Sequence, residues 1–294
     1  MVPESTSRRS EISPRLDSVV GSKRIGIEMR CAAAPLALLM LPPRAPQARR
    51  VRMDASADLT TAIRREHPNV AERPSSAPQL PPLRNRYIGV RHGQSTANVE
   101  KIISSDFMRG CTDHGLTPDG VAQARAAADG LVRLLPPERL ERSMIVLSSP
   151  FARARETAAE VLSALRAEHG LSEKVFLIEP LLRERWFGEL DGTSLAPPSN
   201  YNKVWPLDWL DAQNDDCGVE SVEEVCGRVA TLLAKLEAAH SGRDIVLVSH
   251  ADTLQIAQIV LCGADPRRFS QYRFANGEAR DMLELPEPAP LPFP

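Results

Sequence analysis

The chain has 294 residues, of which 43% are hydrophobic and 25% are charged. This composition excludes fibrous and fully disordered chains and is typical of a globular protein with a sizeable core. A net charge of −2 argues against a nucleic-acid partner. The longest apolar run, Cys31 to Leu41, is far shorter than the ~20 residues that a membrane-spanning helix needs. We therefore predict no membrane span.

The first 84 residues differ from the rest of the chain. They carry 14 Lys and Arg and 8 Asp and Glu, a net charge of about +6. The remainder carries 22 Lys and Arg and 30 Asp and Glu, a net charge of about −8. They are rich in Arg, Ser and Pro, so we predict a disordered leader over residues 1–84. Two interpretations stay open: an organelle-targeting segment of a plastid or mitochondrial protein, or a solvated tail or start-site artefact of a cytoplasmic one, with Met53 as a second start.

From Asn85 onward, predicted strands and helices alternate. Strands are predicted over Tyr87–Val90, Met144–Ser149, Lys174–Pro180 and Ile245–Ser249, with a closing strand near Glu278–Leu285. Helices are predicted after Thr117, from about Ala152 to Glu168 and from Ser221 to about His240. A further helix follows the strand Ile245–Ser249 and runs to about Leu261. A Trp- and Pro-bearing loop is predicted over Trp186–Glu220. Thr117 is placed to be an N-cap and Gly170 a helix end, while Ser221 and Glu224 fit a capping box.

This alternation predicts an α/β fold, a three-layer sandwich in which helices flank a mostly parallel central sheet. The predicted domain covers residues 85–287, followed by a Pro-rich tail over 288–294. The five cysteines include no CxxC pair and are odd in number, so neither a zinc knuckle nor a disulfide scaffold is indicated.

Polar side chains follow the four predicted parallel strands at the point where each strand ends. They are Arg91 and His92, Arg153 one turn into the next helix, Glu184, and His250. Because parallel strands end along one edge of a sheet, these side chains are expected to share one crevice. Each has an ordinary structural explanation taken singly: a hydrogen-bonded core histidine, a solvated helix face or a surface charge cluster. Their joint placement favours a site.

The residue types in this crevice suit a phosphate group. Two guanidinium groups offer forked donors for phosphate oxygens. Gly93 allows the backbone to approach an anion, and Ser95 and Asn98 add neutral donors. A metal site is disfavoured, because a hard cation needs several carboxylates and zinc prefers three or four His or Cys ligands. Neither GxxxxGK[ST] nor GxGxxG occurs, which disfavours nucleotide binding by those loops.

The sequence resembles the histidine phosphatase superfamily in its phosphoglycerate-mutase-like branch. The resemblance covers residues 86 to 285 and rests on five motifs in order, which are RHG (91–93), SSPFARARETA (148–158), LLRERWFGELDG (181–192), VESVEEV (219–225) and VSHADT (248–253). It implies that His92 is the nucleophile that becomes a phosphohistidine, and that Arg91, Arg153 and His250 hold the phosphate. It also implies that Glu184 donates a proton to the leaving oxygen. It implies no metal or organic cofactor.

The sequence departs from the family pattern at three places. Gln94 stands where many members carry Glu, and a neutral amide there leaves the role of His92 intact. Ala251 and Asp252 follow the second histidine where Gly pairs are common, so Asp252 is expected to contact the substrate. Phe187 stands where Tyr is frequent, and a hydroxyl contact is lost there.

The choice between hydrolysis and phosphoryl transfer rests on the loop after Gly192. Mutases of this family carry a long basic insertion there, whereas residues 193–219 hold Lys203 as the single base, against Asp208, Asp211, Asp215 and Asp216. We therefore predict a phosphomonoesterase for a small metabolite, a sugar phosphate or a phosphoglycerate-like ester. A mutase-type phosphotransferase and a non-catalytic phosphate-binding protein remain the alternatives. Trp186, Trp205 and Trp209 are placed to line the mouth of the site or to pack inside. The sequence does not reveal the oligomeric state.

Overall fold

The computed structural model describes residues 54–195 and 201–290. Its centre is a five-stranded sheet in the order β3-β2-β4-β1-β5. The strands are β1 (Arg86–Arg91), β2 (Met144–Ser148), β3 (Phe176–Ile178), β4 (Asp244–Ser249) and β5 (Ala279–Asp281). The first four strands pair in parallel, and β5 runs antiparallel to β1.

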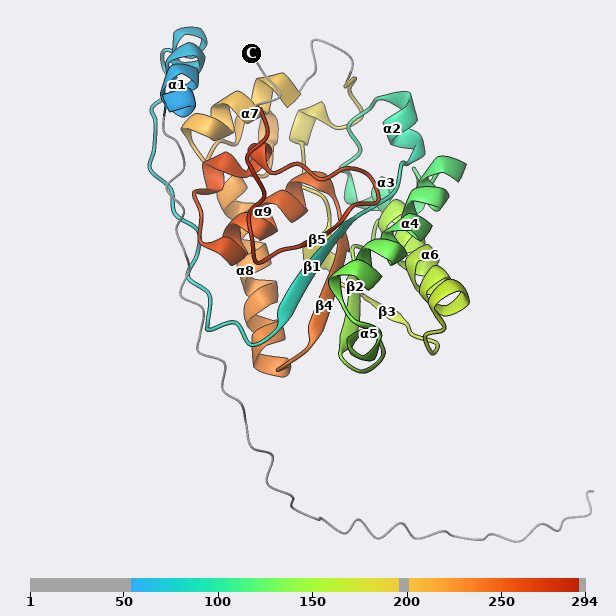
Figure 1. Cartoon of the computed structure of the whole chain (residues 1–294). Helices are drawn as coiled ribbons and strands as arrows, with labels where there is room; N and C mark the ends of the chain where they lie inside the picture. The colour runs from blue at the N-terminus through green and yellow to red at the C-terminus, as the bar shows by residue number, and fades with distance from the viewer. Residues whose placement is uncertain (1–53, 196–200, 291–294) are drawn as a thin grey trace, which may run out of the picture. The chain divides into compact units, whose positions relative to one another are not determined.

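Helices cover both faces of this sheet (Figure 1). They are α1 (Asp54–Glu66), α2 (Thr96–Glu100), α3 (Phe107–Thr112), α4 (Pro118–Leu134), α5 (Pro137–Arg142), α6 (Ala152–His169), α7 (Tyr201–Leu210), α8 (Val222–Ala239) and α9 (Ala251–Cys262). One core cluster joins α4 and α6 to the sheet, and another joins α8 and α9 to its other face. The predicted three-layer α/β fold is confirmed.

Local signals in the sequence set the ends of the main helices. Thr117 caps α4 by accepting a hydrogen bond from the Gly120 N–H, and Gly170 ends α6 in the left-handed region at φ 67°. Ser221 and Glu224 form the predicted capping box at the start of α8. Helices α6 and α9 both begin at the same edge of the sheet, because they follow directly on the ends of the parallel strands β2 and β4.

Two predictions for the middle of the chain are wrong in detail. β3 is only three residues long, Phe176–Ile178, and much shorter than the predicted strand. The predicted loop over Trp186–Glu220 contains α7 and two 3-10 turns, Gly188–Leu190 and Asp216–Gly218. Helix α7 was hidden because its Trp and Pro residues give little helical periodicity, and because it is stabilised by contacts with distant parts of the chain.

The prediction of a disordered leader is wrong for residues 54–84. Helix α1 places Ile63, 3% exposed, against Trp209 and Leu210. Further along, Arg73 pairs with Asp211 at 3.2 Å, and the backbone N–H of Arg84 donates to Glu237 at 2.7 Å. These long-range contacts offset the chain entropy that composition alone suggested would prevail. Residues 1–53 lie outside the described residues.

The start of the predicted Pro-rich tail also contacts the domain. The N–H of Ala289 donates to the carbonyl of Gln271 at 2.9 Å, and Arg273 donates to the carbonyl of Pro290 at 2.6 Å. Residues 291–294 lie outside the described residues.

Among the described residues, none of the helices combines the length and the apolar character that crossing a bilayer requires.

The packing of α1 can be tested with Ile63→Ala. Removing this buried side chain should lower the free energy of unfolding by about 2–4 kcal/mol, because transfer energy is lost and a cavity remains. Urea denaturation followed by circular dichroism measures it, with Arg65→Ala, on an exposed position of the same helix, as the matched control. Equal stability of the two variants would show that α1 does not pack on α7.

Candidate active site

His92 lies directly after β1, and its backbone N–H donates to the carbonyl of Ser249 on β4 at 2.9 Å. The side chain is 3% exposed. Its Nδ1 lies 2.7 Å from the carbonyl of Gly93, so this nitrogen carries the hydrogen. The other nitrogen, Nε2, accepts a hydrogen bond from Nε of Arg153 at 3.1 Å. The ring is therefore held as the neutral tautomer with its Nε2 lone pair facing a cation.

The surroundings of His92 disfavour the imidazolium form. Burial, followed by the charges of Arg153 and Arg91, lowers the pKa of His92 well below its ordinary value. Only the bond to Gly93 acts in the other direction. A lone pair that stays free of protons at neutral pH is what a nucleophile requires.

The two guanidinium groups are fixed by neutral oxygens. Arg153 is 4% exposed and donates to both the hydroxyl and the carbonyl of Ser104, at 3.2 and 2.9 Å. Arg91 donates to the carbonyl of Phe274 at 2.6 Å. Burial lowers the pKa of Arg153 to about 10 and lowers that of Arg91 as well. Both groups stay charged at neutral pH. Their hydrogen bonds to these neutral oxygens do not cancel the charge.

His250 stands beside His92, with ring centroids 5.1 Å apart. It precedes α9 as the N-cap residue, and its Nε2 lies 2.8 Å from the hydroxyl of Ser149. Burial and the charge of Arg153 lower the pKa of His250 well below its ordinary value. This ring therefore offers polar atoms without adding a charge.

Two buried nitrogens of this group have no hydrogen-bond partner in the described part of the chain: Nε of Arg91 and Nδ1 of His250. Buried polar atoms are rarely left unpaired in folded proteins. Helix α9 also has no side-chain cap, and the N-terminal end of a helix attracts anions. An oxyanion bound between Arg91, Arg153 and His250 would satisfy these atoms.

Glu184 contacts the start of α9, and its Oε1 accepts hydrogen bonds from two backbone groups. The donors are the N–H of Arg185 at 2.9 Å and the N–H of Thr253 at 3.4 Å, whereas the Thr253 hydroxyl, 3.3 Å from Oε1, donates to the carbonyl of Arg183 at 2.8 Å. Glu184 is 8% exposed, and it acts electrostatically on both Arg91 and Arg153. A carboxyl group is thus present beside the anion site.

Asp252 is held in the same crevice by residues that the sequence did not single out for this role. Trp205 on α7 donates its indole N–H to Oδ2 of Asp252 at 3.2 Å, and Nη1 of Arg185 lies 3.7 Å away. Arg185 in turn forms a paired contact with Asp208 at 2.6 and 2.9 Å, with both side chains fully buried. This ion pair fixes α7 against the site.

Tyr201, also on α7, is a site residue that sequence reasoning missed. Its ring stacks on Trp205 at 4.6 Å and packs edge to face on Phe187 at 4.9 Å. Burial and the carboxyl groups of Asp252 and Glu184 raise the pKa of its hydroxyl. Tyr201 therefore brings a hydroxyl to the region where Phe187 lacks one. A tyrosine in a loop of unknown course gave no signal for this placement.

The predicted substrate-binding residues after His92 have mainly structural partners. A Cβ on Gly93 would lie 2.2 Å from the carbonyl oxygen of Gly120, so glycine is needed for the approach of α4. Ser95 and Asn98 form the capping box of α2, and the Ser95 hydroxyl is committed to it. Of the nine predicted site residues, Arg91, His92, Arg153, Glu184, His250 and Asp252 gather in the crevice.

The acidic loop, residues 193–219, exposes fewer of its carboxylates than its sequence suggested. Asp208 is fully buried against Arg185, and Asp211 is 9% exposed, which leaves Asp215 and Asp216 as its exposed carboxylates. Trp209 is also internal, at 1% exposure, and donates its indole N–H to Thr60 at 3.1 Å.

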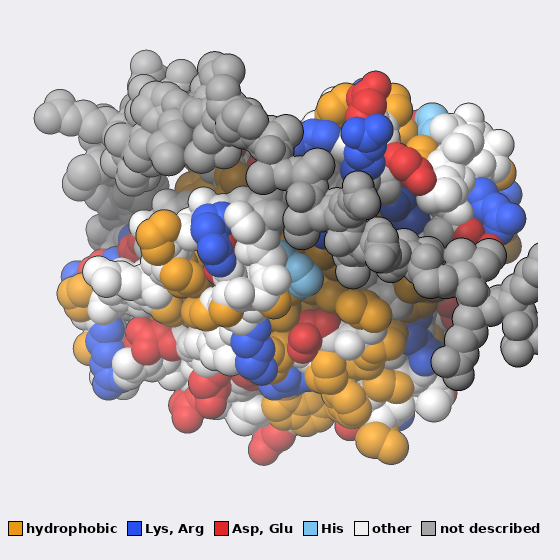
Figure 2. All heavy atoms as spheres, turned by 90° about the horizontal axis from the view of Figure 1, so that it is seen from below, with side chains coloured by type: hydrophobic (Ala, Val, Ile, Leu, Met, Phe, Trp, Pro, Cys, Tyr) orange, Lys and Arg blue, Asp and Glu red, His pale blue; other side chains and the backbone are white. Residues whose placement is uncertain are grey.

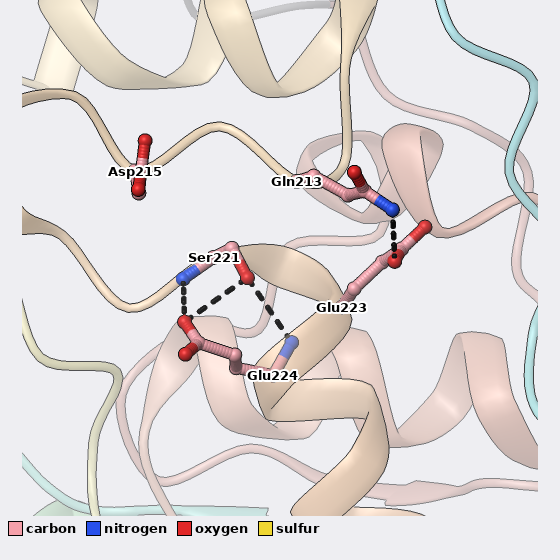
Figure 3. Close-up of a pocket in the computed structure, with 5 residues that line it drawn as sticks. All are labelled: Gln213, Asp215, Ser221, Glu223 and Glu224. Carbon is pink, nitrogen blue, oxygen red and sulfur yellow. Dashed lines mark hydrogen bonds between the residues drawn. The ribbon is translucent and has the colours of Figure 1, made fainter.

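A separate cavity of about 400 Å³ lies beside this loop (Figure 3) and is lined by Gln213, Asp215, Ser221, Glu223 and Glu224. Its polar groups are largely bonded to one another: Ser221 to Glu224, and Gln213 to Glu223 at 2.9 Å. These bonds cap α8, so the cavity has a structural explanation.

Charge elsewhere on the surface is mixed. On the face shown in Figure 2, basic and acidic side chains are interspersed, and hydrophobic side chains gather on part of it. Asp129, Glu168 and His169 form an exposed group of metal-ligating type. It lies at the far end of α6, roughly 24 Å along the helix from Arg153, and has no part in the crevice.

Comparisons with known proteins identify a family for this chain. The family described as the histidine phosphatase superfamily (branch 1) matches residues 88–282. A 2,3-bisphosphoglycerate-dependent phosphoglycerate mutase of Methylobacterium radiotolerans is 32% identical over 202 residues, which cover 64% of this chain and 84% of the mutase. The sedoheptulose 1,7-bisphosphatase of Saccharomyces cerevisiae is 28% identical over 193 residues, or 60% of this chain and 67% of that enzyme.

Solved structures extend the comparison. Mycobacterial glucosyl-3-phosphoglycerate phosphatase, in complex with VO3, is similar to this chain with a TM-score of 0.52 and 25% sequence identity. The match covers 66% of this chain and 90% of that phosphatase. Both hydrolases and mutases are thus among the proteins that this chain is similar to.

The neutral state of the two buried histidines predicts how stability depends on pH. Their lowered pKa values mean that the unfolded chain binds more protons than the folded one below about pH 6.5. The free energy of unfolding should therefore fall on acidification, by up to ~1.4 kcal/mol per histidine and pH unit. Urea denaturation at pH 7.5 and 5.5 measures the loss, and His92→Gln should reduce it. An equal loss in the variant would show that His92 is not held neutral.

Proposed function

Because the chain belongs to branch 1 of the histidine phosphatase superfamily, we propose that it is a metal-independent phosphomonoesterase for a small phosphorylated metabolite, acting through a phosphohistidine. The observation that carries this proposal is the neutral His92, whose Nε2 lone pair faces Arg153 beside two unpartnered nitrogens of Arg91 and His250. A nucleophile and an oxyanion site therefore lie side by side.

In the first half of the reaction, the phosphoryl group of the substrate enters between Arg91, Arg153 and His250. Its oxygens take the hydrogen bond that Arg153 now gives to His92, which releases the Nε2 lone pair. Nε2 then attacks phosphorus as the bond to the leaving oxygen breaks in line. The guanidinium groups stabilise the charge of the transition state, and the bond from Nδ1 to Gly93 steadies the ring as it becomes positive.

In the second half, water replaces the departed alcohol and attacks phosphorus, and the electron pair of the N–P bond returns to Nε2 of His92. Proton transfer at both stages is assigned to Glu184, which first protonates the leaving oxygen and then accepts a proton from water. Its bonds to the N–H groups of Arg185 and Thr253 hold the carboxyl group at the edge of the site.

Hydrolysis is favoured over mutase activity by the charge of the walls around the site. A mutase must retain a second phosphate, and Lys203 is the single Lys or Arg between residues 193 and 219. Arg185 on the nearby wall is already committed to Asp208. The mutase alternative is supported by the 32% identity with a phosphoglycerate mutase.

The nucleophile can be tested with His92→Ala. This variant should lose at least about 10³-fold in kcat for p-nitrophenyl phosphate, since it lacks the nitrogen that is proposed to attack phosphorus. Circular dichroism checks the fold, and acid-labile, base-stable labelling from a ³²P-ester should appear in the wild type alone. His240→Ala, outside the crevice, is the control. Turnover that survives in His92→Ala would refute the histidine mechanism.

The choice between hydrolase and mutase can be tested with 3-phosphoglycerate and a bisphosphoglycerate primer. We expect release of inorganic phosphate from metabolite esters to exceed isomerisation, because the site lacks cations for a second phosphate. A coupled mutase assay and a phosphate assay on the same preparation compare the two rates. Isomerisation faster than hydrolysis would select the mutase alternative. A folded protein that binds vanadate with neither activity would select the non-catalytic one.

A further inference from the structure

Asp252 is a buried carboxyl group at the anion site. It is the second residue of α9, two positions after His250, and is 2% exposed. Among the described residues, the hydrogen bond to its side chain comes from the indole N–H of Trp205 at 3.2 Å. A carboxylate removed from water with so few donors is costly, whereas the protonated acid is not.

The nearest cation does not neutralise this group. Nη1 of Arg185 lies 3.7 Å from Asp252 but 2.6 Å from Asp208, which takes two hydrogen bonds from the same guanidinium. The charged and titratable groups that act on Asp252 from the surrounding elements are Glu184, Arg185, Asp208, Tyr201 and Arg91. Burial first, and then the charge of Glu184, raise the pKa of Asp252 to about 7.

Glu184 and Asp252 both lie at the N-terminal end of α9, but their hydrogen-bond donors and charged neighbours differ. Oε1 of Glu184 accepts hydrogen bonds from two backbone N–H groups, those of Arg185 and Thr253, and hydrogen bonds of this kind favour an ionised carboxylate. Asp252 has fewer donors and more negative neighbours. A phosphoryl dianion bound at Arg91 and Arg153 adds further negative charge nearby, and so it favours the protonated form of Asp252 when the substrate is in place.

We propose that Asp252 is a second catalytic carboxyl group, which holds a proton at neutral pH and gives it to the oxygen of an alcohol leaving group. Asp252 then replaces Glu184 as the proton donor for such esters, and Glu184 remains the base for water. The substrate class is accordingly an alkyl phosphate, such as a sugar or polyol ester, whose alkoxide cannot leave unprotonated. Trp205 is a positioning residue that holds Asp252 through its indole N–H. This inference rests on the proposed phosphatase function.

The step is balanced in atoms and electrons. The bond between Nε2 of His92 and phosphorus forms, and the bond between phosphorus and the ester oxygen breaks. The electron pair of the broken bond stays on that oxygen, which takes the proton of Asp252 and departs as the alcohol. Asp252 is left as a carboxylate. When water later attacks phosphorus, its proton passes to the carboxyl pair and restores the starting state.

Asp252→Asn tests the proposal through the leaving group. A nitrophenolate leaves without a proton, whereas an alkoxide requires one. The variant should therefore lose about 100-fold or more in kcat/KM for the best alkyl phosphate of a metabolite panel, and less than about 5-fold for p-nitrophenyl phosphate. Asp211→Asn, a largely buried aspartate just after α7, is the matched control and should affect neither ester. Retained nitrophenyl turnover also shows that the variant is folded.

Equal losses on the two esters, or no loss on either, would overturn the proposal while leaving the phosphatase function in place. If the phosphatase function itself were wrong, the wild type would hydrolyse neither ester faster than His92→Ala does.

Trp205→Phe supplies a second measurement. Its N–H lowers the pKa of Asp252, so its loss raises that pKa and keeps the acid protonated to higher pH. The alkaline limb of the pH profile for the alkyl ester should move upward, and the profile for the nitrophenyl ester should not. An unmoved limb in a folded variant would contradict the role of Asp252.

Discussion

The contact between Arg153 and the unprotonated nitrogen of His92, at 3.1 Å, is the constraint on which the active site depends. A cation that donates to this nitrogen both orients the lone pair and opposes protonation of the ring. Arg153 can do so only because α6 begins where β2 ends and because Ser104 takes its other hydrogens. The geometry of the sheet edge therefore determines the chemical state of His92, the proposed nucleophile.

This arrangement places several charges in a region from which water is largely removed. Such charges destabilise the fold unless hydrogen bonds or opposite charges compensate for lost hydration. The buried charged groups differ in how fully hydrogen bonds and opposite charges compensate for their lost hydration. Arg185 and Asp208 satisfy each other, so losing one partner would cost about 3–5 kcal/mol. Arg91 keeps an unpartnered Nε. Nδ1 of His250 is also without a partner among the described residues, and both atoms belong to the anion site, where a substrate would supply the missing partner.

Much of the fold could be predicted from local signals. The strands from Arg86 and from Asp244 follow from buried apolar runs, and α4 and α8 from their capping residues, because neighbours in sequence determine those features. The convergence of His92, Arg153, Glu184 and His250 followed from the rule that parallel strands end at one edge. What local sequence cannot give is which distant segment covers that edge.

Helices α1 and α7 illustrate the limit. Each is stabilised by partners far along the chain: Ile63 by Trp209, and Asp208 by Arg185. Their own composition indicated a disordered leader and an irregular acidic loop. As a result, the placement of Tyr201, the link from Trp205 to Asp252 and the burial of Asp208 were not predictable.

The balance of charge in the crevice connects these features. Arg91 and Arg153 contribute two positive charges, and the pair of Arg185 and Asp208 contributes none overall. If Glu184 and Asp252 were both ionised, they would cancel the attraction for a phosphoryl dianion at short range. With Asp252 protonated, the crevice keeps a net positive charge while still holding a transferable proton. In the proposed mechanism, helix α7 therefore affects both the binding of the anion and the departure of the alcohol, through Trp205 and Asp208.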